Sequence, residues 1–216
     1  MRGTILITGF GPFPGAPFNP TAALVRRLAD LRRPALSGVR IVTHLFRTSY
    51  AAVDRELPAL IAHHRPVALL MFGLATRAKT LRIETQARNS LAHRPDADRI
   101  TPAGRAIARG RPARLPLPAP ARRLLAAARL AGVPATLSRD AGSYLCNYLC
   151  WRAAEATRKT GGPRLAAFVH VPPIRRNPRP RGRRQHHALT PDHLTRAGAS
   201  ILVALSAGLG SARNHF

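Results

Sequence analysis

The sequence contains three short runs that are apolar almost without interruption, at residues 3–9 (GTILITG), 66–73 (PVALLMFG) and 165–171 (LAAFVHV). Such runs predict β-strands buried on both faces, because a half-exposed strand would alternate apolar and polar side chains. Residues 39–46 and 134–138 complete the predicted strands, and residues 81–89 show the alternation of an extended segment. Strands of this kind need covering layers on both sides of their sheet.

Segments with a helical spacing of apolar residues alternate with these strands, at residues 21–31, 50–63, 119–131, 142–157 and 190–207. Asn19 directly before Pro20 predicts the start of the first helix, because Asn caps helices well and Pro suits the first helical position. Thr190 has the capping role before the last helix. The alternation predicts an α/β fold with a mostly parallel sheet, in a single domain over residues 1–216. Functional side chains then lie beyond the carboxyl ends of strands.

The chain is strongly basic, with 35 Lys and Arg against 9 Asp and Glu, for a formal net charge of +26. Such a charge favours non-specific contact with nucleic acid or anionic membranes. Lys occurs only at positions 79 and 159, however, and Ala and Pro are abundant, which is the bias of a GC-rich coding sequence. The Arg residues are spread along the chain, and the Pro- and Arg-rich residues 94–118 and 172–188 are predicted to form irregular loops. We favour compositional drift over a selected polyanion-binding role.

No apolar stretch approaches the ~20 residues that a membrane-spanning helix needs, and we interpret the N-terminal MRGTILITGF as a first strand rather than a signal peptide. The two Cys, Cys146 and Cys150, lie four residues apart, where a disulfide would close a small ring of poor geometry. The lack of a disulfide framework predicts a reducing, cytoplasmic compartment. The segment CNYLC lacks a second pair of zinc ligands, so it is not a zinc-finger motif, and we expect no cofactor.

Cys146 is the first candidate for chemistry, in the segment DAGSYLCNYLCW at the opening of a predicted helix. The helix dipole favours the thiolate form of a Cys at that position. The alternative is a buried core Cys, which this segment alone favours, because free Cys is among the most buried residue types. A reactive Cys also needs a base beside it.

Two further residues complete a candidate triad. His170 ends the apolar strand in FVHVPP, where ligands bind at a sheet end, and the alternative is a hydrogen-bonded structural His. Glu84 lies in LRIETQARN and is one of only 9 acidic residues, and the alternative is a salt bridge to one of the many Arg residues. Together, Cys146, His170 and Glu84 provide the nucleophile, base and orienting acid that cysteine catalysis requires.

Four ordered segments resemble the pyroglutamyl peptidases of type I (pyrrolidone carboxyl peptidases), namely ILITGFGPFPGAPFNPT at 5–21, RIETQARN at 82–89, SRDAGSYLCNYLCW at 138–151 and AFVHVPPI at 167–174. The segment LTPDHLTRAGASILVAL at 189–205 is similar to the last helix of that family. Several signatures in order are far more specific than a lone motif. The resemblance extends through nearly the whole chain.

The resemblance implies a three-layer α/β/α sandwich with a mostly parallel twisted sheet, assembled as a homo-oligomer (a dimer or tetramer) and needing no metal. It also implies a cysteine peptidase that hydrolyses the N-terminal pyroglutamyl residue from peptides through a thioester intermediate. Cys146 would be its nucleophile, His170 its base and Glu84 its orienting acid.

The resemblance assigns the substrate pocket as well. It implies that Phe10 and Phe13 form the pocket for the lactam ring and that Asn19 supports the site. The turn after the third strand departs from the family pattern, because it reads GLATRAKT with Leu74 where Gln is common. Arg77 keeps a basic position in this turn.

Two other functions stay open at this stage. A nucleic-acid-binding module would account for the charge, but the aromatic residues do not interleave with the Arg clusters to form a stacking platform. An inactive relative with a scaffold role is the other alternative. Retention of Cys146, His170 and Glu84 argues against it.

Overall fold

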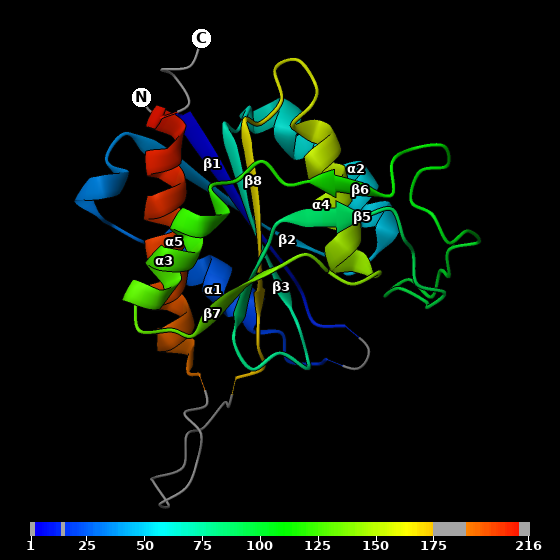
Figure 1. Ribbon diagram of the computed structural model, residues 1–216, viewed down its shortest axis with the longest axis horizontal. Coiled ribbons are helices and arrows are strands. Elements are labelled where there is room, and N and C mark those ends of the chain that lie inside the picture. Colours follow the sequence, from blue (N-terminus) through cyan, green and yellow to red (C-terminus); the bar gives the residue numbers. More distant parts are fainter. Residues whose placement is uncertain (1–2, 14–15, 175–188, 212–216) are drawn as a thin grey trace, which may run out of the picture.

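The computed structural model describes residues 3–13, 16–174 and 189–211 (Figure 1). Its strands are β1 (Gly3–Phe10), β2 (Val39–Phe46), β3 (Ala68–Leu74), β4 (Leu81–Glu84), β5 (Gln86–Arg88), β6 (Arg114–Pro116), β7 (Ala135–Ser138) and β8 (Leu165–Val171). Its helices are α1 (Pro20–Ala29), α2 (Tyr50–His64), α3 (Ala121–Leu130), α4 (Leu145–Ala156) and α5 (Pro191–Ser211), with a short 3-10 turn, η1 (Pro34–Leu36). Most of the predicted loop at 172–188 lies outside the described residues.

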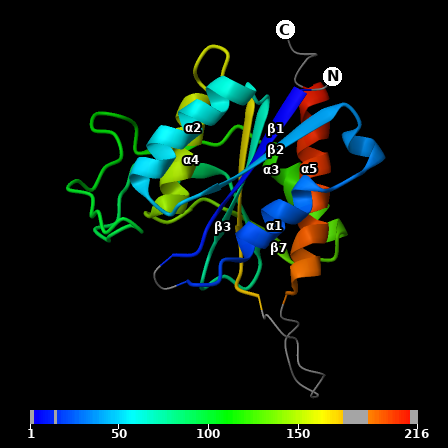
Figure 2. The ribbon, with the colours of Figure 1, turned by 180° about the vertical axis from the view of Figure 1, so that it is seen from behind.

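The main sheet has the strand order β2-β1-β3-β8-β4-β7. Strands β2, β1, β3 and β8 run parallel to one another, whereas β4 pairs antiparallel with β8 and parallel with β7. Helices α1, α3 and α5 cover one face of the sheet, and α2 and α4 cover the other (Figures 1 and 2). The predicted three-layer α/β/α sandwich with a mostly parallel sheet is confirmed.

The hydrophobic core is divided by the sheet into two halves. Along β1, Ile5 and Ile7 pack on the side of α1 and α5, while Leu6 points to the side of α2 and α4. Strand β3 divides in the same way, with Leu70 on the first side and Leu69 on the second. Successive side chains of a strand point to opposite faces, and both faces are covered here. This is why the strands read as uninterrupted apolar runs in the sequence.

The first residues of two helices, α1 and α4, determine where the site lies. Asn19 caps α1, because its side chain accepts a hydrogen bond from the backbone N–H of Thr21 at 3.1 Å, and Pro20 follows it as predicted. Helix α4 begins at Leu145, three residues later than predicted. The reason is Gly142, whose φ of 84° lies in the left-handed region and outside a right-handed helix. The later start places Cys146 in the first turn of α4.

The segment around Glu84 differs from its simple prediction. Residues 81–89 were expected to be one extended segment, but they divide into β4, which joins the main sheet, and β5, which leaves it. Strand β5 pairs antiparallel with β6, a strand within residues 94–118, which were expected to be irregular. Strand β6 has only three residues, a length too short to show a period of two in the sequence.

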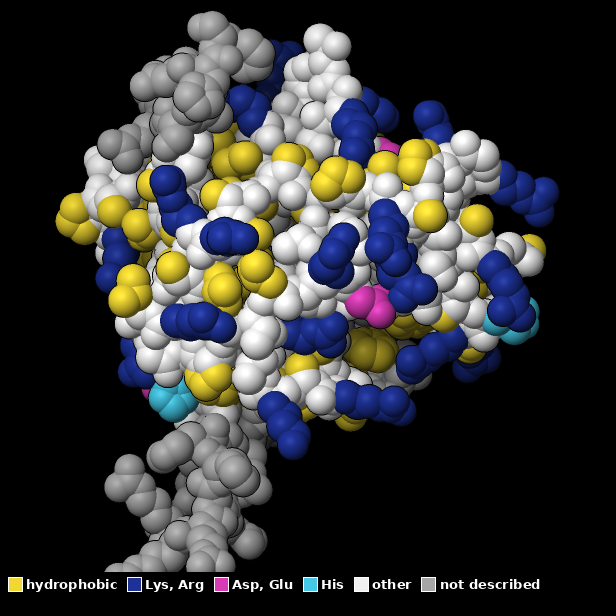
Figure 3. Space-filling view, in the orientation of Figure 1, with side chains coloured by type: hydrophobic (Ala, Val, Ile, Leu, Met, Phe, Trp, Pro, Cys, Tyr) yellow, Lys and Arg dark blue, Asp and Glu magenta, His cyan; other side chains and the backbone are white. Residues whose placement is uncertain are grey.

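The surface of the protein carries Lys and Arg side chains all over the face in Figure 3, with no single basic patch. Several acidic side chains are held in ion pairs, such as Asp54 with Arg152 at 2.9 Å and Asp192 with Arg27 at 2.6 Å. None of the helices in the described ranges combines the length and the hydropathy that a membrane span requires.

Asn147 joins α4 to the strand β5 from a fully buried position. Its side-chain amide accepts from the N–H of Arg88 at 2.8 Å and donates to the carbonyls of Arg88 and Ser90 at 2.8 and 3.1 Å. We predict that Asn147→Ala lowers the free energy of unfolding by about 2 to 4 kcal/mol, because it leaves buried backbone groups without partners. Asn147→Asp should be worse, since a carboxylate cannot donate to either carbonyl.

Urea unfolding, followed by the fluorescence of the single, fully buried Trp151, measures both variants. Arg123→Ala, at an exposed position of α3, is the control and should stay within about 0.5 kcal/mol of the unchanged protein. An Asn147→Asp protein as stable as the control would contradict the bonding described here.

Candidate active site

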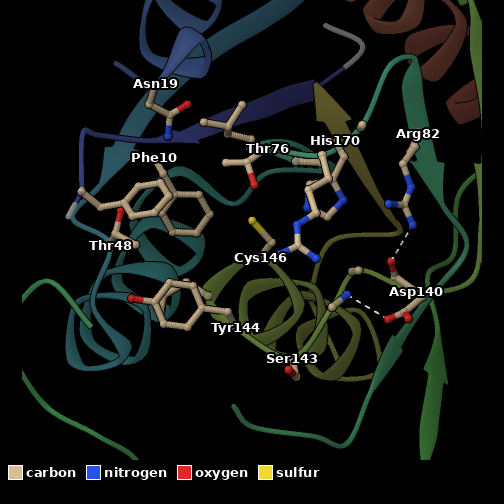
Figure 4. Close-up of a pocket in the computed structure, with 18 of the residues that line it drawn as sticks. Phe10, Asn19, Thr48, Thr76, Arg82, Asp140, Ser143, Tyr144, Cys146 and His170 are labelled. Atoms are coloured by element: carbon tan, nitrogen blue, oxygen red, sulfur yellow. Dashed lines mark hydrogen bonds between the residues drawn. The ribbon is translucent and has the colours of Figure 1, made fainter. Parts of the chain in front are cut away.

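A cavity of about 430 Å³ opens at the carboxyl-terminal edge of the parallel strands (Figure 4). Five of the six residues predicted from the sequence line it: Phe10, Phe13, Asn19, Cys146 and His170. The sixth, Glu84, lies behind His170, with its side chain fully buried. Residues separated by more than a hundred positions in the chain therefore meet at one place, as the parallel sheet predicts.

Glu84 and His170 form a buried hydrogen-bonded pair. The Nδ1 of His170 donates to the Oε1 of Glu84 at 2.8 Å, and both side chains are almost completely shielded from solvent. Their contact follows from the sheet, because β4 pairs antiparallel with β8 and places Glu84 opposite Phe168, two residues before His170. Side chains two residues apart on a strand lie on the same face, so the carboxylate can reach the ring.

The surroundings of His170 favour its protonated form. Burial alone lowers the pKa of its imidazole, but the charge and hydrogen bond of Cys146, together with those of Glu84, outweigh this effect and raise the pKa to about 9. The site therefore holds an imidazolium near neutral pH. An imidazolium beside a thiol is the setting that favours a thiolate.

Cys146 has a partly exposed side chain and lies in the first turn of α4, where it points into the cavity beside His170 (Figure 4). No side chain caps this helix in the described structure, so the N–H groups of its first turn have no capping side chain as an acceptor. These donors, with the positive end of the helix dipole, can stabilise negative charge at the cavity.

Cys150 has very different surroundings, although it lies on the same helix. Its side chain is completely buried, and burial is the main cause that raises the pKa of its thiol well above the ordinary value. A buried neutral thiol is a poor nucleophile. The first interpretation of Cys146 from its own segment, a buried core Cys, therefore fits Cys150 instead.

Gly73, near the end of β3, lies directly against the thiol. A Cβ atom at this position would lie 2.6 Å from the Sγ of Cys146 and 2.6 Å from the Cζ of Phe168. Side-chain atoms do not approach this closely, so only Gly allows the strand to pass behind the sulfur. Gly73, the first residue of the turn GLATRAKT, therefore positions Cys146.

The walls of the cavity contain residues that sequence reasoning missed. Thr48 and Tyr144 line it together with Phe10 (Figure 4), and the guanidinium of Arg94 stacks over the ring of Tyr144 at 4.9 Å. Arg82 lines the other side and lies 3.7 Å through its Nε from the Oε1 of Glu84. Tyr144 and Arg82 stand within the segments around Cys146 and Glu84, and that proximity was the available signal.

The turn after β3 also contributes to the cavity. Leu74 and Arg77 both line it, with Arg77 exposed to solvent. The departure at Leu74 therefore falls within the site itself, where an apolar side chain stands in place of an amide. In the described ranges, no group of three or more His, Cys, Asp and Glu side chains has the arrangement of a metal site.

Comparison with known proteins identifies the family. The family model described as pyroglutamyl peptidase matches residues 3–180. The chain belongs to the pyroglutamyl peptidase family. The match includes the segments of Glu84, Cys146 and His170, which the geometry brings together independently.

Other members of the pyroglutamyl peptidase family are similar to this chain over most of its length. The pyrrolidone-carboxylate peptidase of Halalkalibacterium halodurans is 34% identical over 178 residues, covering 80% of this chain and 85% of the relative. Among solved structures, the pyrrolidone carboxyl peptidase from Thermococcus litoralis has a TM-score of 0.86 at 25% identity and covers 99% of this chain and 98% of its own. That of Thermus thermophilus has a TM-score of 0.78 at 30% identity and covers 93% and 100%.

Replacement of Gly73 tests how closely this pyroglutamyl peptidase positions its thiol. We predict that Gly73→Ala slows alkylation of Cys146 by iodoacetamide roughly tenfold or more, because the new methyl group pushes the sulfur away from His170. Gly104→Ala is the matched control, since its new Cβ would meet only the carbonyl of Ala106 at 3.9 Å. Equal alkylation rates in the two variants would show that the thiol does not depend on Gly73.

Proposed function

We propose that this chain is a cysteine peptidase that removes the N-terminal pyroglutamyl residue from peptides. The observation that carries this function is the arrangement of Cys146, His170 and Glu84 at the edge of a cavity, in a chain of the pyroglutamyl peptidase family. A thiol, an imidazolium and a buried carboxylate in hydrogen-bonded sequence are the parts that nucleophilic catalysis needs.

Cys146 and His170 perform the two halves of the reaction. The thiolate of Cys146 attacks the carbonyl that joins pyroglutamate to the next residue, and His170 gives its proton to the leaving amine. The resulting thioester is hydrolysed by a water molecule that His170, now neutral, activates as a base. Backbone N–H groups in the first turn of α4 stabilise the negative oxygen of each tetrahedral intermediate.

Glu84 keeps the imidazole in a productive state. Its carboxylate accepts the Nδ1–H of His170, which leaves the other ring nitrogen to exchange protons with Cys146 and the substrate. Its negative charge adds to the larger effect of Cys146 in stabilising the imidazolium and raising the pKa of His170.

The apolar side of the cavity suits the lactam ring. Pyroglutamate has no free α-amine, so its pocket needs no acidic partner, only an apolar slot with a few hydrogen-bonding groups. Phe10 and Phe13 provide the slot, and Asn19 supports it by donating to the carbonyl of Gly11 at 3.2 Å while it caps α1. The side chain of Asn19 therefore has both proposed roles: it caps α1 and supports the site.

The finer properties of the protein follow from the family and the charge. The resemblance supports a homo-oligomer, either a dimer or a tetramer, and the lack of a disulfide framework supports a cytoplasmic location. The formal charge of +26 supports non-specific contact with polyanions, which we regard as a by-product of composition, because Lys and Arg are spread over the face in Figure 3 and along the chain.

The first test of this function is a fluorogenic pyroglutamyl amide. We predict that the unchanged protein cleaves it, that Cys146→Ala reduces turnover by at least about a thousandfold, and that Cys150→Ala retains most of it. Cys150 is the matched control because it shares the helix but is buried away from the cavity. No turnover by the well-folded unchanged protein would favour the inactive, scaffold alternative instead.

The pH dependence tests the role of Glu84. The imidazolium of His170 is present below its raised pKa and is lost as pH rises through about 9, so kcat/KM should fall along an alkaline limb near that pH. Glu84→Gln removes a charge that stabilises the imidazolium, so the pKa of His170 should fall and the limb should move to lower pH.

The pH profile of the Glu84→Gln variant distinguishes this role from a purely structural one. Lower turnover with an unshifted limb would mean that Glu84 only holds the fold. The raised pKa also stabilises the folded protein: this contribution is complete below the ordinary pKa of 6.5 and is lost as pH rises through about 9.

A further inference from the structure

The cavity has two chemically different sides, and Cys146 lies between them (Figure 4). Phe10 and Tyr144 stand on one side, where the lactam ring is proposed to bind. His170 stands on the other side together with Arg82 and Asp140. The pairing of the strands supports this division, because Arg82 of β4 lies directly opposite His170 of β8.

The position of His170 decides where the rest of the peptide lies. Its ring must reach the leaving nitrogen to give it a proton, and the leaving nitrogen belongs to the residue after pyroglutamate. The substrate carbonyl carbon is attached to Cys146 during this step, with the lactam ring held on the apolar side. The residue after pyroglutamate therefore extends past His170, toward Arg82.

Arg82 is held in place with part of its guanidinium free. Its Nη2 donates to the Oγ of Ser138 at 2.9 Å and to the carbonyl of Asp140 at 3.1 Å, which fixes the direction of the side chain. In the described ranges no hydrogen bond engages its Nη1, and 35% of the side chain is exposed at the cavity. A guanidinium fixed by two bonds offers its remaining N–H groups to a carboxylate at little cost in side-chain entropy.

The other charges around the cavity reinforce a positive field. Arg77 and Arg94 also line it, both exposed. The one acidic side chain among its described lining residues is Asp140, and the Oδ1 of this carboxylate is already engaged. It accepts from the Nη1 of Arg88 at 3.1 Å and from the N–H of Gly142 at 2.9 Å. A cationic group on a substrate would therefore meet three arginines and a carboxylate that is paired.

We propose that this side of the cavity selects peptides with an acidic residue directly after the pyroglutamyl residue, and that Arg82 is the main residue that reads this carboxylate. Arg77 and Arg94 contribute the surrounding field. This specificity rests on the proposed function, because it concerns the leaving group of the same reaction. The interaction is an exposed or half-exposed one, so it is weakened by salt.

The experiment compares kcat/KM for three peptides that differ only in the second residue: pyroglutamyl-Asp, pyroglutamyl-Ala and pyroglutamyl-Lys, each with the same following residues. At low salt we expect a preference for Asp over Lys of roughly fivefold or more, since the two substrates differ by two charges beside a cluster of cations. High salt should reduce this ratio toward one.

Variants assign the preference to its residues. Arg82→Gln should lower the Asp-to-Lys ratio roughly threefold or more, while Arg82→Lys, which keeps the charge but loses the fixed guanidinium, should lower it less. Arg77→Glu should also lower the ratio. Arg77 is exposed and, unlike Arg82, has no ion pair with Glu84 in the described structure, so its effect does not pass through Glu84. Arg122→Gln, on the exposed surface of α3, is the charge-matched control and should leave the ratio unchanged.

The outcomes separate this inference from the function beneath it. Cleavage of all three peptides with a ratio near or below one at low salt would overturn the specificity and leave the peptidase function standing. A loss in Arg82→Gln that is equal for Asp, Ala and Lys would show that Arg82 only supports Glu84, and would overturn its role in reading the substrate. Failure of the unchanged protein to cleave any of the three would instead overturn the proposed function itself.

Discussion

The hydrogen bond between His170 and Glu84 is the contact on which this protein depends most. A carboxylate buried as deeply as Glu84 is stable only with a partner, because an uncompensated charge in the interior costs several kcal/mol. His170 provides that partner, and Arg82 adds a second positive charge at 3.7 Å. The pair also crosses the antiparallel junction of β4 with β8. The same contact therefore links the side chains of the two antiparallel strands and stabilises the imidazolium in the proposed mechanism.

The remaining parts of the site are positioned by rigid elements. Cys146 comes from a helix start, His170 from the end of a central strand, and Gly73 from the neighbouring strand that closes the space behind the sulfur. Helix α4 packs into one core half, and β3 and β8 contribute side chains to both halves, so the geometry of the thiol is set by the core and not by a loop. The contrast between Cys146 and Cys150 shows the same principle, since one turn of α4 separates a cavity residue from a core residue.

Sequence patterns predicted most of the fold. Strands β1, β3 and β8 could be predicted from their apolar runs because both of their faces are buried. The start of α1 could be predicted because capping by Asn19 is a local property. The start of α4 was misplaced because the left-handed φ of Gly142 leaves no periodic signal. Strand β6 was missed because its pairing with β5 is a long-range contact of three residues.

The candidate site shows the same limit. Cys146, His170 and Glu84 were predicted as a triad because each stands in a distinct ordered segment, but nothing in the sequence states the distance between them. Arg82 was overlooked for a different reason. In a chain with 35 basic residues, its closeness to Glu84 in the sequence was a weak signal, and only the antiparallel register places it opposite His170.

The place of β8 in the strand order has a consequence for how the protein is made. This strand is the last of the sheet to leave the ribosome, yet it lies in the middle, between β3 and β4. Until residues 165–171 are synthesised, β2-β1-β3 and β4-β7 are two separate pieces, each with an open edge and an uncovered apolar surface. Open edges of this kind favour association between nascent chains, so we expect the protein to be most prone to aggregation before this long-range pairing forms.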